Sequence, residues 1–248
     1  MTLLYVLALL PARATSDFDP STPDASFTGE ETYTIDGESR LWGEIERLHD
    51  TDRTLFHQES FNSVTAWAEG SKYAPWVAEC FGDTEPASGY ALLHVGIHAD
   101  TASGTPILFV PGAGDNASRG FIAMATHMDE VGRPVFALTF AHPHGDVFMQ
   151  AEMVADAIAR IKARTGADQV DLVSHSKGGL ASAVYLSNSE DADWGDDAYA
   201  AVGTRYRGDV YKAVFIATPL GGIDSGFRWS NMNLASLVPD RRRVWRLT

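Results

Sequence analysis

Four short, continuous apolar runs separated by helical segments are the feature that most constrains the fold of this chain. The runs lie at residues 107–110, 134–140, 170–173 and 213–217 and are rich in Val, Ile, Leu and Phe. Runs of this length suit parallel strands that are covered on both faces. Because strands that alternate with helices form layered sheets, the pattern predicts the α/β class, with a doubly wound, mostly parallel sheet.

Two further elements are predicted from periodicity. Residues 93–97 alternate apolar and polar side chains, which predicts a half-exposed antiparallel strand. The clearest helix spans about residues 147–164, with Gly166 as its C-terminal cap. Four apolar side chains share one face of that helix: Met153, Ala157, Ile158 and Ile161.

The remaining segments carry weaker patterns. Residues 30–88 show no clean periodicity, although residues 41–48 are compatible with one helical face. Residues 187–211 are acidic and polar, so we expect a surface excursion before the fourth apolar run.

A candidate nucleophile lies where the third apolar run meets a helix. Residues 171–180 combine a buried strand, a small-x-Ser-x-Gly turn centred on Ser176, and a helix from Gly178. Small residues beside a serine allow the strained turn of a nucleophile elbow, which lifts Oγ above the sheet edge. Ser174 stands where the pattern usually has glycine. Taken alone, Ser176 could equally cap a helix, which is a common role of serine.

A second element lies where such a fold requires one. Residues 107–114 run from a strand into the loop Val-Pro-Gly-Ala-Gly, whose backbone N–H groups can face a substrate oxygen. Together with the Val-Ser-His-Ser-Lys-Gly-Gly elbow at residues 173–179, this loop resembles the bacterial and fungal lipase/esterase branch of the α/β-hydrolases. The resemblance covers roughly residues 90–235.

The resemblance implies that Ser176 is the nucleophile and that the backbone N–H groups of Ala113 and Lys177 form the oxyanion hole. Two such donors contribute about 3 kcal/mol each to stabilising a tetrahedral intermediate. No metal or organic cofactor is implied. We expect the Lys177 side chain to be a solvated cation and His175 to pack beside the elbow, facing away from Ser176, so neither is assigned as the base.

The loop after the second apolar run holds His142, His144 and Asp146. These residues lack the spacing of a known zinc pattern, so we expect a wall of the substrate pocket there rather than a metal site. The turn at residues 217–224 resembles one that borders the acyl pocket in lipases. Apolar side chains beyond it predict either a mobile lid or core packing: Phe227, Trp229, Met232, Leu234 and Leu237.

A complete catalytic triad is not found in the sequence. In this fold the triad follows the chain order Ser, then Asp or Glu, then His, and no histidine follows Ser176. Asp224 and Asp240 are the late carboxylates outside the acidic stretch, and no spacing argument makes either of them the triad acid. The strands that carry acid and base would need about 50 or more further residues.

Two interpretations follow from the missing triad. We expect an N-terminal fragment of a longer lipase or esterase whose C-terminal strands are missing here. The alternative is a complete hydrolase-fold protein without hydrolytic chemistry, acting as a binding module or recruiting His142 or His144 in an unusual order.

The N-terminus predicts export. Residues 3–10 are apolar, and Ala12-Arg13-Ala14 supplies a small-x-small cleavage pattern. No later run approaches the ~18 residues that a membrane span requires. We therefore predict a secreted or periplasmic protein with a signal peptide at 1–14, an extension with early strands and helices at 15–89, and an incomplete hydrolase core at 90–248.

The net charge and the cysteine content exclude some classes of partner and covalent cross-link. The chain has 19 Lys and Arg against 33 Asp and Glu, a net charge of −14, which argues against nucleic acid and anionic membranes as partners. Cys80 is the single cysteine, which excludes an internal disulfide. The sequence therefore predicts an exported serine carboxylic-ester hydrolase acting on small-molecule or lipid esters. Polyester depolymerases, thioesterases and acyltransferases share the elbow and remain alternatives.

Overall fold

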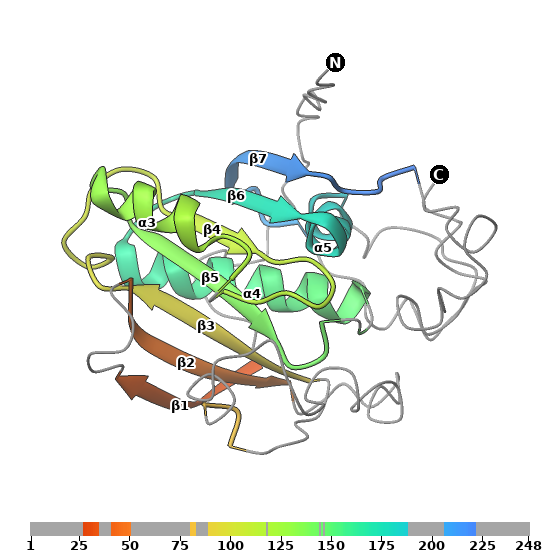
Figure 1. Cartoon of the computed structure of the whole chain (residues 1–248), viewed down its shortest axis with the longest axis horizontal. Coiled ribbons are helices and arrows are strands. Elements are labelled where there is room, and N and C mark those ends of the chain that lie inside the picture. Colours follow the sequence, from red (N-terminus) through yellow and green to blue (C-terminus); the bar gives the residue numbers. More distant parts are fainter. Residues whose placement is uncertain are drawn as a thin grey trace.

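A mixed seven-stranded sheet forms the centre of the protein (Figure 1). The computed structural model describes residues 27–34, 41–50, 80–82, 89–187 other than 118, 144 and 146, and 206–221. The strand order is β1-β2-β3-β5-β4-β6-β7. The described strands and helices are β1 (Phe27–Thr34), β2 (Trp42–Asp50), β3 (Tyr90–Gly96), β4 (Ile107–Val110), α3 (Ile122–Glu130), β5 (Val135–Phe140), α4 (Val147–Thr165), β6 (Val170–His175), α5 (Ser176–Leu186) and β7 (Val210–Ile216).

The four apolar runs form β4, β5, β6 and β7, and these strands are parallel to one another, as predicted. The prediction of a mostly parallel sheet is wrong for the sheet as a whole. Three of its pairings, β1 with β2, β2 with β3 and β3 with β5, are antiparallel. The strands before residue 97 therefore form an antiparallel half of the sheet, which continues the parallel half. The fold is an α/β fold with a mixed sheet.

Helices cover both faces of the sheet. Figure 1 shows α3 on one face and α4 with α5 on the other. One cluster of buried side chains joins Leu108, Leu138 and Leu172 to α4. A second cluster joins Phe109 and Ala137 to α3. The parallel strands are thus buried on both sides, which explains why their sequences are continuously apolar.

Strand β3 is antiparallel as predicted, but it is not half exposed. All side chains from Ala91 to Gly96 are buried, including the polar His94. Leu93 and Val95 pack in the cluster with α4, while His94 lies on the opposite face against the edge of the Trp42 ring. Both faces of β3 are therefore covered by other parts of the protein. The alternation of polarity along the strand does not mark one face that packs in the core and another that is exposed to solvent.

Residues 41–48 are largely strand β2 and form no helix. Trp42, Ile45 and Leu48 are fully buried, and their spacing of three imitates a helical stripe. The register shifts between Trp42 and Glu44, so Gly43 acts as an extra residue that brings Trp42 and Ile45 to the same face. Leu48 packs on the opposite face, with α4. The helix-like spacing of three thus arises because both faces of β2 are buried and because the strand contains one bulge.

Helix α4 agrees with its predicted bounds to one residue at its end. Gly166 adopts a φ of 71° and its N–H donates to the Lys162 carbonyl oxygen at 2.8 Å, which confirms the predicted C-terminal cap. The four side chains predicted to share a face are all buried.

An ion-pair ladder connects α4 to β2. The ladder consists of Arg160 with Glu46 and Arg164 with Glu44. Arg164 also donates to both carboxylate oxygens of Asp100, at 2.7 and 2.8 Å. Burial raises the pKa of Glu46, and the Arg160 guanidinium opposes that shift. The ladder thus fixes the C-terminal half of α4 against the antiparallel half of the sheet.

Several predictions concern residues outside the described part of the chain. These are the signal peptide, most of the 15–89 extension, the acidic stretch from 188 to 205, and everything after residue 221, including the lid residues, Asp224 and Asp240. Cys80 is described and is buried. None of the helices in the described ranges is long and apolar enough to cross a membrane.

Candidate active site

Ser176 lies in a sharp turn between β6 and α5, as predicted. Its φ is 50°, in the left-handed region, whereas the preceding His175 is extended with φ −116°. That region costs a residue with a Cβ about 1–2 kcal/mol. The helix begins at Ser176, two residues before the predicted Gly178. Ser176 itself is partly exposed, so its hydroxyl stands at the end of a strand where a substrate can approach.

Glycines allow the neighbouring backbone to approach this turn. A Cβ placed on Gly112 would lie 2.8 Å from the Ser176 Cβ. A Cβ on Gly178 would lie 2.7 Å from the Val110 carbonyl oxygen and closer still to that of Pro111. The loop after β4 therefore packs directly against the turn, and only glycine permits that distance.

The segment after β7 completes the surroundings of the turn. A Cβ on Gly179 would lie 2.6 Å from the Thr218 Cγ2, so α5 also begins in contact with this segment. Ala217 has a φ of 49°. The Thr218 Oγ1 is buried, and within the described residues it has no hydrogen-bond partner. The predicted turn at 217–224 marked this region, but no sequence signal distinguished Thr218 as the contact.

Three loops thus meet at one edge of the sheet. Strands β4, β6 and β7 are adjacent and parallel, so their carboxyl ends lie together. In open α/β sheets this edge is where ligands bind. The segments predicted to carry the oxyanion donors, at Ala113 and Lys177, are in contact here. Because the first N–H groups of a helix lack intrahelical acceptors, the start of α5 favours a developing negative charge.

The Lys177 side chain is not a solvated cation, which corrects the prediction. It is buried, and its Nζ donates to Oε1 of Gln150 on α4. Gln150 Nε2 in turn donates to the His142 carbonyl oxygen at 2.9 Å. Lys177 lies in the first turn of α5, on a helix that packs against α4, so its side chain is enclosed between the two helices. A polar chain therefore connects the elbow with the loop after β5.

His175 packs beside the elbow, as expected. Its ring meets the Phe121 ring edge-on, with centroids 6.4 Å apart and an interplanar angle of 86°. His142 is buried after β5, whereas His144 and Asp146 lie outside the described residues. In the part of the chain that the structure describes, no side chain is hydrogen-bonded to the Ser176 Oγ. The geometry therefore places the nucleophile candidate and its loops but assigns no base.

The loop from Gly112 to Phe121 is anchored beneath the sheet edge. The Ala117 N–H donates to the Thr139 Oγ1 at 3.1 Å. Thr139 Oγ1 lies 2.9 Å from Nε2 of His94. Burial lowers the pKa of His94 to about 3, so its imidazole is neutral at ordinary pH. None of these residues was singled out from the sequence.

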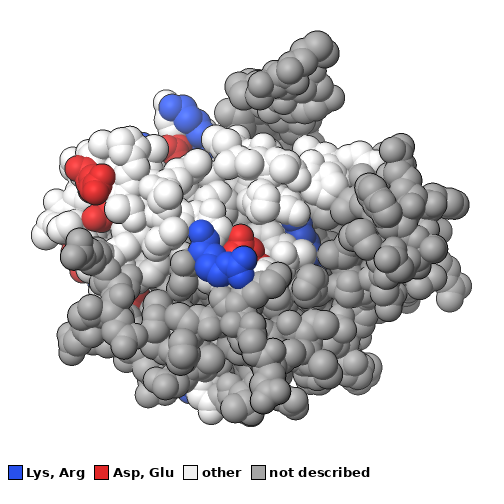
Figure 2. Space-filling view, viewed as in Figure 1, with Lys and Arg blue, Asp and Glu red and all other residues white. Residues whose placement is uncertain are grey.

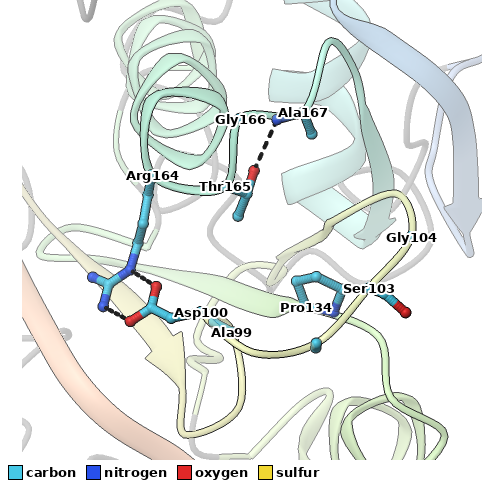
Figure 3. A pocket seen from close by; sticks show the side chains of 10 residues that line it. Ala99, Asp100, Ser103, Gly104, Pro134, Arg164, Thr165, Gly166 and Ala167 are labelled. Carbon is cyan, nitrogen blue, oxygen red and sulfur yellow. Dashed lines mark hydrogen bonds and ion pairs between the residues drawn. The ribbon is translucent and has the colours of Figure 1, made fainter.

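A cavity of about 500 Å³ lies at the other edge of the sheet (Figure 3). Its lining comes from the turn after β3, from Pro134 before β5, and from the end of α4, where Arg164 reaches across to Asp100. These positions are at the amino ends of β4, β5 and β6, so the cavity is separate from Ser176. Both carboxylate oxygens of Asp100 already accept from Arg164.

The loop between β4 and α3 carries a charged pair, in which the Arg119 Nε lies 3.9 Å from the Asp115 Oδ1. In the view of Figure 2, basic and acidic atoms lie side by side near the centre of the face. The described surface on that face is mostly uncharged, with scattered acidic and basic groups. Among the described residues, no group of three or more His, Cys, Asp or Glu side chains is arranged to hold a metal ion.

The chain was compared with protein families, curated proteins and solved structures. No family model matches the chain, and no curated protein matches it. Among solved structures, the chain is similar to the mature form of the Bacillus licheniformis lipase BlEst2, with 24% sequence identity and a TM-score of 0.40. The match covers 62% of this chain and 58% of that lipase. The chain thus spans less than two thirds of the length of the protein it matches.

Proposed function

We propose that the protein is a serine ester hydrolase of the α/β-hydrolase kind, with Ser176 as its nucleophile. The observation that carries the proposal is the φ of 50° at Ser176, in a turn that leads from a parallel strand directly into a helix. A strained serine at this point is the defining geometry of a nucleophile elbow.

A purely structural role does not account for this geometry. The residue that precedes the helix as its N-cap is His175, and no side chain makes a capping hydrogen bond there. Within the described residues the Ser176 Oγ likewise makes no hydrogen bond to a backbone N–H of α5, so its side chain does not cap the helix. Glycine would occupy a φ of 50° without strain, and strain held at one polar side chain is typical of functional sites. These points support a chemical role for the hydroxyl.

The proposed reaction is acyl transfer to Ser176. Its Oγ attacks the carbonyl carbon of an ester while a general base takes the hydroxyl proton. The backbone N–H groups of Ala113 and Lys177 stabilise the oxyanion of the tetrahedral intermediate. The same base then protonates the leaving alcohol, and water releases the acid from the acyl-enzyme. We place the base outside the described residues, because no described histidine is hydrogen-bonded to the Ser176 Oγ.

Labelling with a fluorophosphonate probe tests this proposal. The full chain should be modified once, at Ser176, and Ser176→Ala should abolish the modification. Ser187→Ala is the matched control, because Ser187 lies at the other end of α5 and its Oγ donates to the Val184 carbonyl oxygen. Modification that persists in Ser176→Ala would show that another residue is the nucleophile. A chain-length series of p-nitrophenyl esters would then distinguish a lipase from a short-chain esterase.

The second candidate is a binding protein built on the same fold. It is favoured by the lack, among the described residues, of a base hydrogen-bonded to Ser176. A chain that reacts with neither the probe nor any ester of the series, but binds an ester or its acid at the elbow, would support this candidate. Export also remains a proposal, and the N-terminal sequence of the protein recovered outside the cytoplasm would test it.

A further inference from the structure

A buried polar chain joins strands β3 and β5 to the loop that follows β4. It consists of His94, Thr139 and the backbone N–H of Ala117, all of them fully buried. The N–H of Ala117 is 3.1 Å from the Thr139 Oγ1, which is 2.9 Å from the His94 Nε2. The two side chains come from adjacent antiparallel strands, while Ala117 lies in irregular structure.

Burying two polar side chains at the centre of a sheet destabilises the folded state unless hydrogen bonds compensate for their desolvation. An apolar β-branched residue would fill either position without desolvating a polar group. The N–H of a buried loop residue, by contrast, requires an acceptor, because no strand or helix partner is available. Thr139 supplies that acceptor. We therefore attribute His94 and Thr139 to the hydrogen bonding of the loop and not to the stability of the sheet.

The protonation of His94 suits this arrangement. Burial lowers its pKa to about 3, so the imidazole is neutral and one ring nitrogen can accept a hydrogen bond. A threonine hydroxyl has one proton to donate. When it donates to the His94 Nε2, its lone pairs are turned toward the N–H of Ala117. The Trp42 ring packs edge-on against the imidazole, with centroids 5.6 Å apart and an interplanar angle of 61°.

The anchored loop is the one that touches the elbow. At its start Gly112 lies against Ser176, and at its end the Phe121 ring lies against His175. Between these contacts, the N–H of Ala117 bonds the loop to the sheet. Displacement of Ala117 would therefore be transmitted to both contacts.

We propose that His94 and Thr139 are positioning residues that hold the loop from Gly112 to Phe121 in place against Ser176. The inference rests on the proposed function in one respect, namely that the Ala113 N–H of this loop is an oxyanion donor. The anchoring itself is independent of any chemistry at Ser176. Both side chains are fully buried, so their proposed role is to position the loop and not to contact a substrate.

Amide hydrogen exchange measures the anchoring directly. In the unmodified chain the Ala117 N–H should be strongly protected although it lies outside helices and strands. Thr139→Val keeps the shape of the side chain but removes the acceptor, and it should lower that protection about tenfold or more. Thr139→Ser keeps the hydroxyl and should restore it. Thr126→Val is the control, because the Thr126 Oγ1 bonds within α3, to the Ile122 carbonyl oxygen.

A second pair of variants tests the histidine. His94→Gln places a polar amide near the position of Nε2, whereas His94→Leu leaves the Thr139 hydroxyl without this acceptor. We expect His94→Leu to lower the protection of Ala117 and His94→Gln to retain most of it. In the ester assay, Thr139→Val should lower kcat about tenfold with KM within about twofold, since an oxyanion donor acts in the transition state.

The outcomes separate this inference from the proposed function. An unprotected Ala117 N–H in the unmodified chain would overturn the anchoring, whether or not any variant folds. Folded Thr139→Val with unchanged exchange at Ala117 would overturn it as well. Lowered protection together with an unchanged kcat in an active enzyme would remove the positioning role while leaving Ser176 as the nucleophile. If the chain has no activity, the exchange measurements still decide whether the loop is anchored.

Discussion

The substitution Gly178→Ala should change the free energy of unfolding in two opposite ways. Gly178 is the third residue of α5, where alanine raises helix propensity by about 1 kcal/mol. The new Cβ would, however, lie 2.7 Å from the Val110 carbonyl oxygen and closer to that of Pro111. Both obstacles are backbone atoms at the end of β4, so no side-chain rotation relieves the contact.

The steric cost should exceed the gain. Ordinary van der Waals contact begins at 3.4 Å, so the helix and the loop after β4 must separate by about 0.7 Å for the Val110 oxygen alone. Overpacking of a closely packed site costs about 1–3 kcal/mol, and a contact between two backbones lies at the upper end. Subtracting the helix propensity leaves a net destabilisation of about 2 kcal/mol. The separation would also move the loop away from Ser176.

Urea unfolding followed by circular dichroism measures the effect. Gly178→Ala should lower the free energy of unfolding by about 2 kcal/mol, which is a large part of the stability of a small domain. Gly221→Ala is the control, since a Cβ there meets nothing within 4 Å. If Gly178→Ala were as stable as the unmodified chain, or more stable, the close approach of β4 and α5 at the elbow would be incorrect.

Two further predictions concern strain and buried charge. Because Ser176 has a φ of 50°, Ser176→Gly should be more stable than Ser176→Ala by about 1 kcal/mol in urea unfolding, and equal stabilities would contradict the strain. Burial raises the pKa of Asp209, and the hydrogen bond from the Tyr185 hydroxyl opposes that shift. The folded state then binds a proton more tightly than the unfolded state, so stability is lost as pH rises through the raised pKa. Asp209→Asn cannot titrate, so the unmodified chain should lose stability relative to this variant as the pH rises above the ordinary aspartate pKa of 3.8; a difference independent of pH would refute this.

The parallel half of the sheet could be predicted because its signal is local. Each of the four strands is a continuous apolar run, and the turn at Ser176 has a short motif of its own. In the antiparallel half, β3 carries a local signal, the alternation of polarity, but β2 does not. Strand β2 has the period of a helix, because Gly43 shifts the register and both faces are covered.

The contacts that complete the site were not predictable, since they join residues far apart in the chain. His94 and Thr139 are 45 positions apart, and each is an isolated polar residue in an apolar strand. Lys177 looked exposed because a lysine near a helix start usually is, and its partner Gln150 is 27 positions away. A sequence shows which residues are polar, but the acceptor of each appears only when the strands and helices are assembled.

The ion-pair ladder between α4 and β2 links the length of α4 to the geometry of the candidate active site. Arg160 and Arg164 are about 6 Å apart along a helix, and Glu44 and Glu46 are about 7 Å apart along a strand. The two spacings agree closely enough for both pairs to form at once, which sets how far along the sheet the helix lies. Gln150, about 15 Å further along the same helix, is thereby held at the elbow. Removing one residue between Gln150 and Arg160 would turn the two ends of the helix by about 100° relative to each other. Either the ladder or the Lys177 contact would then be lost, even with every other residue unchanged.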